Sequence, residues 1–279
     1  MFTVSVLLRG FSEGLKIIFF PKTTVPTIML LFLITMMITN KLGINSLIQA
    51  NLFFMPLILF SILFVFIANL GNFTFERMLP LFGNGCATTF FSGLSNLFAF
   101  SGISFLYLLP PYLKEQKKFQ KISLASMGIS AIFLILSVMT LLCLFPLAAT
   151  SEEVFPLYLA SRYVQFGRFF QRLDAIFLLI WIISFVSHLS ITLYLSTTIF
   201  QKITNLQYNK WFSSLFAILV FAFGLLPKNL QELGLLENHV YQYTILVLVF
   251  SISLLLLIFA NLKYYFIQKK KGAIAIDKT

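Results

Sequence analysis

Charged residues are scarce in this sequence, and their scarcity argues against a water-soluble fold. Of the 279 residues, only 10% are charged and 59% are hydrophobic, whereas soluble globular chains carry about 25% charged residues. A soluble domain of this composition could not cover its apolar side chains with polar ones. We therefore predict an integral membrane protein.

The residues that usually carry enzyme chemistry are rare as well. The chain has two histidines and two cysteines, and it lacks the G-x-S-x-G, H-E-x-x-H and phosphate-loop motifs. Cys143 lies inside an apolar run, so the cysteines indicate no disulfide framework. We expect a protein that is not an enzyme and that holds no metal ion and no cofactor.

Apolar runs of about 20 residues recur along the chain, and each is long enough to cross a hydrocarbon core of ~30 Å as a helix. They predict an all-α membrane protein with seven spans, at about 24–42, 50–70, 87–112, 122–147, 173–200, 211–227 and 240–262. Residues 1–22 are expected to form the end of a further helix and an interfacial segment, and 263–279 a tail. The whole chain, 1–279, is predicted to be a single transmembrane domain.

The net charge of +11 does not indicate nucleic-acid binding, because lysine and arginine occur in short clusters between apolar runs. One alternating set of connections holds the densest clusters, which are Lys114, Lys117, Lys118 and Lys121 in one loop and Lys263, Lys269, Lys270 and Lys271 in the tail. The positive-inside rule places that loop and the C-terminal tail in the cytoplasm. The opposite connection, Glu152–Gln171, has helical spacing that suits an interfacial helix. A solvated loop is the alternative interpretation.

Small and polar residues crowd the middle of the third predicted span, and a proline pair closes it. They are Ser92, Gly93, Ser95, Asn96, Ser101, Gly102, Ser104 and Pro110-Pro111. One interpretation is a broken helix that lines a cavity and offers free N–H groups to an anionic ligand group. The other is close helix packing through small residues.

The span 173–200 carries a polar stripe. Its polar residues fall within one broad face at about 100° per residue, and they are Ser184, Ser187, His188, Ser190, Tyr194 and Thr198. A histidine at this depth is a candidate ligand donor or proton-sensitive group, but it could also tie two helices together. At the entrance of the span, Arg172 and Asp174, with Arg162 and Arg168 just before them, suit either a salt-bridged collar or simple interfacial anchoring.

Three motifs resemble the endospore germination permeases, the B-subunit family of germinant receptors. The first is Phe170–Ile182, with the sequence FQRLDAIFLLIWI; the others are Leu8-Arg9 followed by Phe20-Pro21-Lys22-Thr23, and Met78-Leu-Pro-Leu81. The resemblance covers essentially the whole chain but only the later part of the family pattern. It implies a LeuT-type helix bundle of the amino acid, polyamine and organocation (APC) superfamily that lacks about the first two helices. About seven complete transmembrane helices and part of an eighth would remain.

The resemblance also implies a function. It describes a receptor subunit of the spore inner membrane that binds a small nutrient germinant such as an amino acid, together with an A subunit and a lipoprotein C subunit. Carried over by position, the ligand pocket would use Phe100, Ser101, Gly102 and Ile103 from the family's sixth helix and Ser187, Ser190 and Tyr194 from its eighth. Two alternatives stay open, an amino acid permease of the same superfamily and an inactive truncated remnant. Transport needs a complete inverted repeat, so the missing helices count against the permease.

Overall fold

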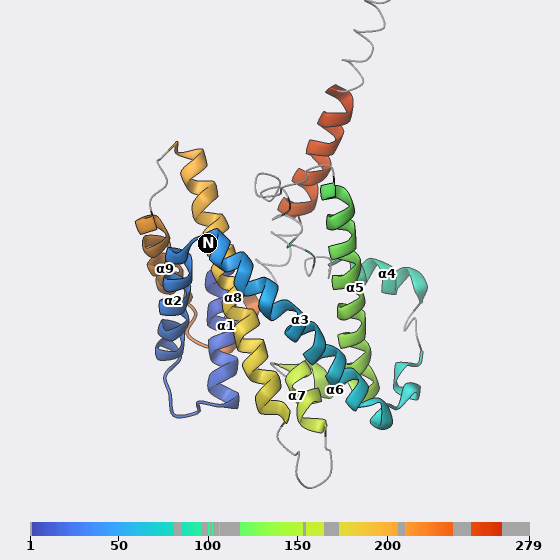
Figure 1. Ribbon diagram of the computed structural model, residues 1–279. Helices are drawn as coiled ribbons and strands as arrows, with labels where there is room; N and C mark the ends of the chain where they lie inside the picture. The colour runs from blue at the N-terminus through green and yellow to red at the C-terminus, as the bar shows by residue number, and fades with distance from the viewer. Residues whose placement is uncertain are drawn as a thin grey trace, which may run out of the picture. The chain divides into compact units, whose positions relative to one another are not determined.

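The computed structural model describes residues 2–80, 85–95, 100, 102, 106, 118–152, 155–164, 173–205, 210–236 and 247–263, and the regular elements among them are helical (Figure 1). The α-helices are α1 (Phe2–Ile18), α2 (Val25–Leu42), α3 (Ile44–Ala68), α4 (Cys86–Ser95), α5 (Phe119–Leu144), α6 (Leu147–Glu152), α7 (Pro156–Tyr163), α8 (Leu173–Ile203), α9 (Lys210–Gly224) and α10 (Leu230–Leu235). Short 3-10 turns cover Leu70–Asn72 and Phe75–Met78, and a π-helical turn covers Val247–Ser251. The all-α prediction is confirmed, whereas the LeuT-type arrangement and the missing helices stay predictions.

Four of the helices in the described part of the chain are long and apolar enough to cross a membrane. They are α2, α3, α5 and α8, and they correspond to the predicted spans 24–42, 50–70, 122–147 and 173–200. The chain is therefore a multi-pass membrane protein by the length and composition of its helices.

The other three predicted spans are matched only in part. The span 211–227 corresponds to α9, which has 15 residues and is shorter than the usual crossing length. Of 240–262, the structure describes the turn Val247–Ser251 and a helix over Ile252–Lys263. Of 87–112, it describes α4 and three single residues, and the rest lies outside the described residues.

The chain divides into two compact units, each of which is described by itself. Met1–Gly83 and Leu109–Leu233 form the first unit, and Asn84–Leu108 and Gly234–Thr279 form the second. The first unit contains all four candidate spans. The predicted single transmembrane domain over 1–279 stays a prediction.

The connection between α2 and α3 shows how local sequence sets helix ends. Proline in the first turn of α2, after the extended Thr24, suits a helix start because that position needs no N–H donor. Gly43 ends α2 with φ +88°, a left-handed conformation that glycine adopts without steric cost. Because this one residue makes the turn, α3 begins at Ile44, six residues before the predicted start at 50.

Helix α1 lies in the core of the first unit and packs against α2, α8 and α9 (Figure 1). Nine of its 17 residues are buried, in the segment 1–22 that we predicted as a helix end followed by an interfacial stretch. The ring of Phe11 stacks on Phe185 of α8 at a centroid distance of 3.7 Å and meets Phe32 of α2 edge to face at 5.6 Å. One aromatic side chain of α1 therefore joins two of the candidate spans.

Candidate functional site

The predicted polar stripe of α8 does not lie on one surface of the first unit. Ser190 is fully buried and Tyr194 is 7% exposed, whereas Ser187 is half-buried and His188 is exposed. The helix is turned so that Leu189 and Leu193 point into the core, which carries Ser190 and Tyr194 inward with them. The structure thus separates the predicted ligand residues of α8 into a buried pair, Ser190 and Tyr194, and an exposed His188.

Ser190 contacts the end of α2 through hydrogen bonds. The hydroxyl of Thr39 donates to Ser190 Oγ at 2.9 Å, and Asn40 Nδ2 donates to the backbone carbonyl of Ser190 at 3.2 Å. Asn40 Nδ2 also lies 2.8 Å from the carbonyl of Met36, but Asn40 Oδ1 is buried without a hydrogen-bond partner among the described residues. This contact fixes α2 against α8 and leaves one buried acceptor open.

Hydroxyl groups continue along α8 beyond this contact. Thr192, Ser196, Thr197 and Thr198 each donate to a backbone carbonyl three or four residues earlier in the helix. Two of these bonds end on the carbonyl of Tyr194. Such bonds satisfy hydroxyls inside an apolar helix without a partner helix, and they often bend it.

Helix α1 carries a buried ion pair that our sequence analysis missed. Arg9 Nη2 lies 2.7 Å from Glu13 Oε1, and the two side chains are 8% and 12% exposed. Both residues lie in the segment 1–22, which we predicted as a helix end and an interfacial stretch, and the structure places them within a helix of the core. Opposite charges at i and i+4 were the available signal, although this spacing is more often found on exposed helix surfaces.

At the entrance of α8, a tyrosine of α7 contacts Asp174. The hydroxyl of Tyr158 in α7 donates to Asp174 Oδ2 at 3.2 Å, while Asp174 Oδ1 is buried without a partner among the described residues. Arg168 and Arg172, two members of the proposed collar, lie outside the described residues, and Arg162 is exposed. Helix α7 itself lies within 152–171, where an interfacial helix was one of the two interpretations.

The predicted pocket residues of the third span belong to the second unit. Phe100 is half-buried and Gly102 is exposed, and Ser101 and Ile103 lie outside the described residues. A Cβ atom added at Gly102 would meet no atom within 4 Å. The ligand-binding role of these residues and of Ser187, His188, Ser190 and Tyr194 stays a prediction.

The described residues offer little for a metal ion. No three His, Cys, Asp or Glu side chains in that part of the chain lie close enough together to hold one. Cys86 is exposed and Cys143 is buried, and both are free thiols.

Long apolar helices that enclose buried hydroxyls, an amide and an ion pair define a polytopic helical membrane protein. The particular family follows from comparison with known proteins. The family model described as spore germination protein matches residues 1–233, so the chain belongs to the spore germination protein family, whose members are receptors or transporters and not enzymes. No curated protein and no solved structure matches the chain.

Proposed function

We propose that this chain is the membrane-embedded subunit of a spore germinant receptor and that it binds a small nutrient, an amino acid. The observation that carries the proposal is the family match over residues 1–233. The buried hydroxyls in the middle of α8 support it, because polar groups are costly at that depth and mark functional sites in membrane helices.

The chemistry of an amino acid suits the predicted pocket. Ser190 and Tyr194 offer hydroxyls that can accept from an ammonium group or donate to a carboxylate. Residues around Gly102 would supply backbone N–H groups to the carboxylate if the third span is broken there. We propose Phe100, Ser101, Gly102, Ile103, Ser187, His188, Ser190 and Tyr194 as the residues that bind the ligand.

The proposed receptor acts in the inner membrane of the dormant spore with two other proteins. An A subunit and a lipoprotein C subunit are the partners that the family resemblance implies. The tail after Lys263 lies in the cytoplasm in this proposal, because the dense lysine clusters are there.

The proposal is tested with spores that lack the gene for this chain. We expect such spores to lose germination on one amino acid while keeping the response to other nutrients, and a copy of the gene should restore it. The response is followed as the fall in optical density of a spore suspension across a nutrient panel. An unchanged response on every nutrient, combined with lost uptake of a labelled amino acid in growing cells, would favour the permease instead.

The proposed orientation makes a separate prediction. A reporter fused after Lys271 should read as cytoplasmic, and one inserted beside Glu153 should read as external, because positively charged loops stay inside. Paired fluorescent-protein and alkaline-phosphatase fusions measure this in growing cells. A fusion inside 114–121 is the control and should behave like the tail. Cytoplasmic signal at Glu153 together with external signal at the tail would reverse the topology.

A further inference from the structure

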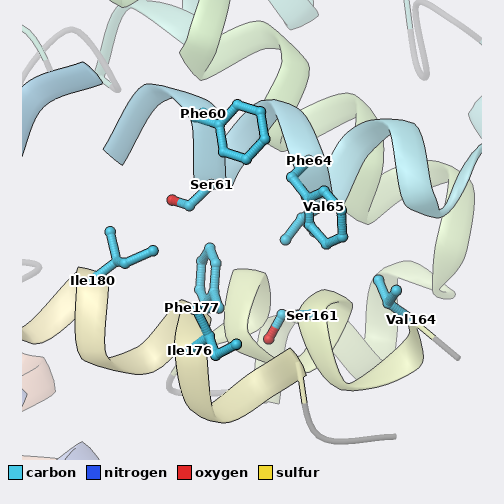
Figure 2. Close-up of a pocket in the computed structure, with 9 residues that line it drawn as sticks. All are labelled: Phe60, Ser61, Phe64, Val65, Ser161, Val164, Ile176, Phe177 and Ile180. Atoms are coloured by element: carbon cyan, nitrogen blue, oxygen red, sulfur yellow. The ribbon is translucent and has the colours of Figure 1, made fainter. Parts of the chain in front are cut away.

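The first unit contains an apolar crevice between α3, α7 and α8 (Figure 2). Its volume is about 190 Å³, which exceeds the ~150 Å³ of an apolar protein cavity that binds benzene. Ser61 of α3 faces Phe177 of α8 across it, and Val164, just after α7, lies at one end. The crevice is thus large enough for a short length of hydrocarbon.

The lining excludes a polar occupant. Seven of the nine lining side chains are apolar, and the two serines are already hydrogen-bonded within their own helices. Ser61 donates to the carbonyl of Ile58 and Ser161 to that of Tyr158, each at 2.7 Å. An occupant therefore finds no free donor there, and water is disfavoured in a cavity of this kind.

The position of the crevice indicates where the occupant comes from. Phe60 and Ile176 are 66% and 57% exposed, so the crevice opens at the outer surface of two helices that are candidate membrane spans. Ile176, Phe177 and Ile180 lie in the first two to three turns of α8, which corresponds to depths of about 5 to 10 Å from the start of the helix. That is the depth of the upper acyl chain of a lipid whose head group lies at the membrane surface.

A charged residue is adjacent in sequence to the lining of the crevice. Arg162 is exposed and lies in sequence between the lining residues Ser161 and Val164, and it makes no ion pair with another described residue. The nearby carboxylate of Asp174 accepts a hydrogen bond from Tyr158. A guanidinium at the head-group level attracts an anionic phosphate, and arginine is well suited to bind one.

We propose that this crevice binds an acyl chain of an anionic phospholipid, whose phosphate group pairs with Arg162. The bound lipid fills the space between α3 and α8 and holds α7 at the membrane surface. The proposal does not depend on germinant binding, and it can be tested on the purified chain.

The tryptophans provide the measurement. Trp181 lies next to the crevice, because its ring centroid is 5.8 Å from that of the lining residue Phe177. The sequence has one other tryptophan, Trp211. In a Trp211→Phe background, lipids brominated in the upper part of their acyl chains should quench Trp181. We expect brominated phosphatidylglycerol to compete for this position about fivefold better than brominated phosphatidylcholine, because one arginine at the surface contributes about that much.

Two variants and two matched controls separate the binding of the lipid acyl chain from the binding of the lipid head group. Ser61→Leu fills the crevice and should remove the specific quenching by both lipids, whereas Arg162→Gln should remove only the preference for phosphatidylglycerol. Ser126→Leu is the control for the first, since Ser126 makes the same kind of helix hydrogen bond on the exposed face of α5. Lys22→Gln removes one exposed charge elsewhere and is the control for the second.

The outcomes decide the proposal. Loss of quenching in Ser61→Leu and loss of preference in Arg162→Gln, with both controls like the parent protein, support it. Equal quenching by the two lipids in the parent protein overturns the anionic lipid. Quenching in Ser61→Leu equal to that of the parent overturns the crevice as a lipid site, and another part of the chain or a second copy then fills it.

Discussion

Arg9→Leu should lower the free energy of unfolding by about 3–5 kcal/mol, because it leaves the carboxylate of Glu13 buried without its cation. The two groups lie 2.7 Å apart in α1, and both side chains are almost completely buried. Arg9 Nε has no hydrogen-bond partner among the described residues. The ion pair with Glu13 is therefore the main interaction that offsets the cost of burying the Arg9 charge. The loss is measured by thermal or denaturant unfolding of the purified chain in detergent micelles.

A double substitution distinguishes the effect of the two charges from the effect of the side-chain volume. Arg9→Met combined with Glu13→Met removes both charges and keeps most of the volume, so we expect it to recover most of the stability that either single change loses. Lys22→Leu is the control, because this lysine is exposed and should tolerate the change within about 0.5 kcal/mol. Normal stability of Arg9→Leu would show that the ion pair does not hold α1 in the core.

The transmembrane helices were predictable from sequence because their signal is long and local. The apolar runs that became α2, α3, α5 and α8 have both the length and the composition that a bilayer requires. The central position of α1 was not predictable in this way. Its charged pair resembles a surface pattern, and burial depends on which helices pack around it, which periodicity does not reveal.

The candidate site was predictable in its residue types but not in its contacts. The polar stripe of α8 was visible at helical spacing, yet the rotation of the helix decides that Ser190 is buried and His188 exposed. The hydrogen bond from Thr39 to Ser190 joins residues 151 positions apart. Such a partner is set by tertiary packing, and a single sequence carries no signal for it.

The entrance of α8 is a second place where tertiary packing sets the partner. The sequence suggested that Arg172 and Asp174 form a salt-bridged collar or anchor the helix at the interface, because opposite charges near a membrane surface attract; Arg172 lies outside the described residues, so the collar stays a prediction. The structure provides the hydroxyl of Tyr158 at 3.2 Å, which is a neutral donor from another helix.

Gly102→Leu should abolish the germination response to the nutrient that the proposed receptor recognises. A Cβ at Gly102 would meet no atom within 4 Å, and its φ lies outside the left-handed region, so neither the backbone nor the first side-chain atom opposes the substitution. The loss would therefore report on a ligand that approaches the backbone closely at this glycine. Gly128→Leu in α5 is the matched control, because a Cβ there also meets nothing within 4 Å.

Tyr194→Ala tests a second residue of the proposed ligand-binding set. Removing the ring and hydroxyl should weaken the response by about tenfold in nutrient concentration, since a lost hydrogen-bond partner costs about 1–3 kcal/mol. Spores that carry each variant at matched protein levels are compared across a nutrient concentration series, with Tyr163→Ala as the exposed control. Dose dependence like that of the parent for both Gly102→Leu and Tyr194→Ala would exclude both residues from the binding site. A shift in Tyr194→Ala alone would keep α8 as the binding helix and remove the sixth helix of the family from the site.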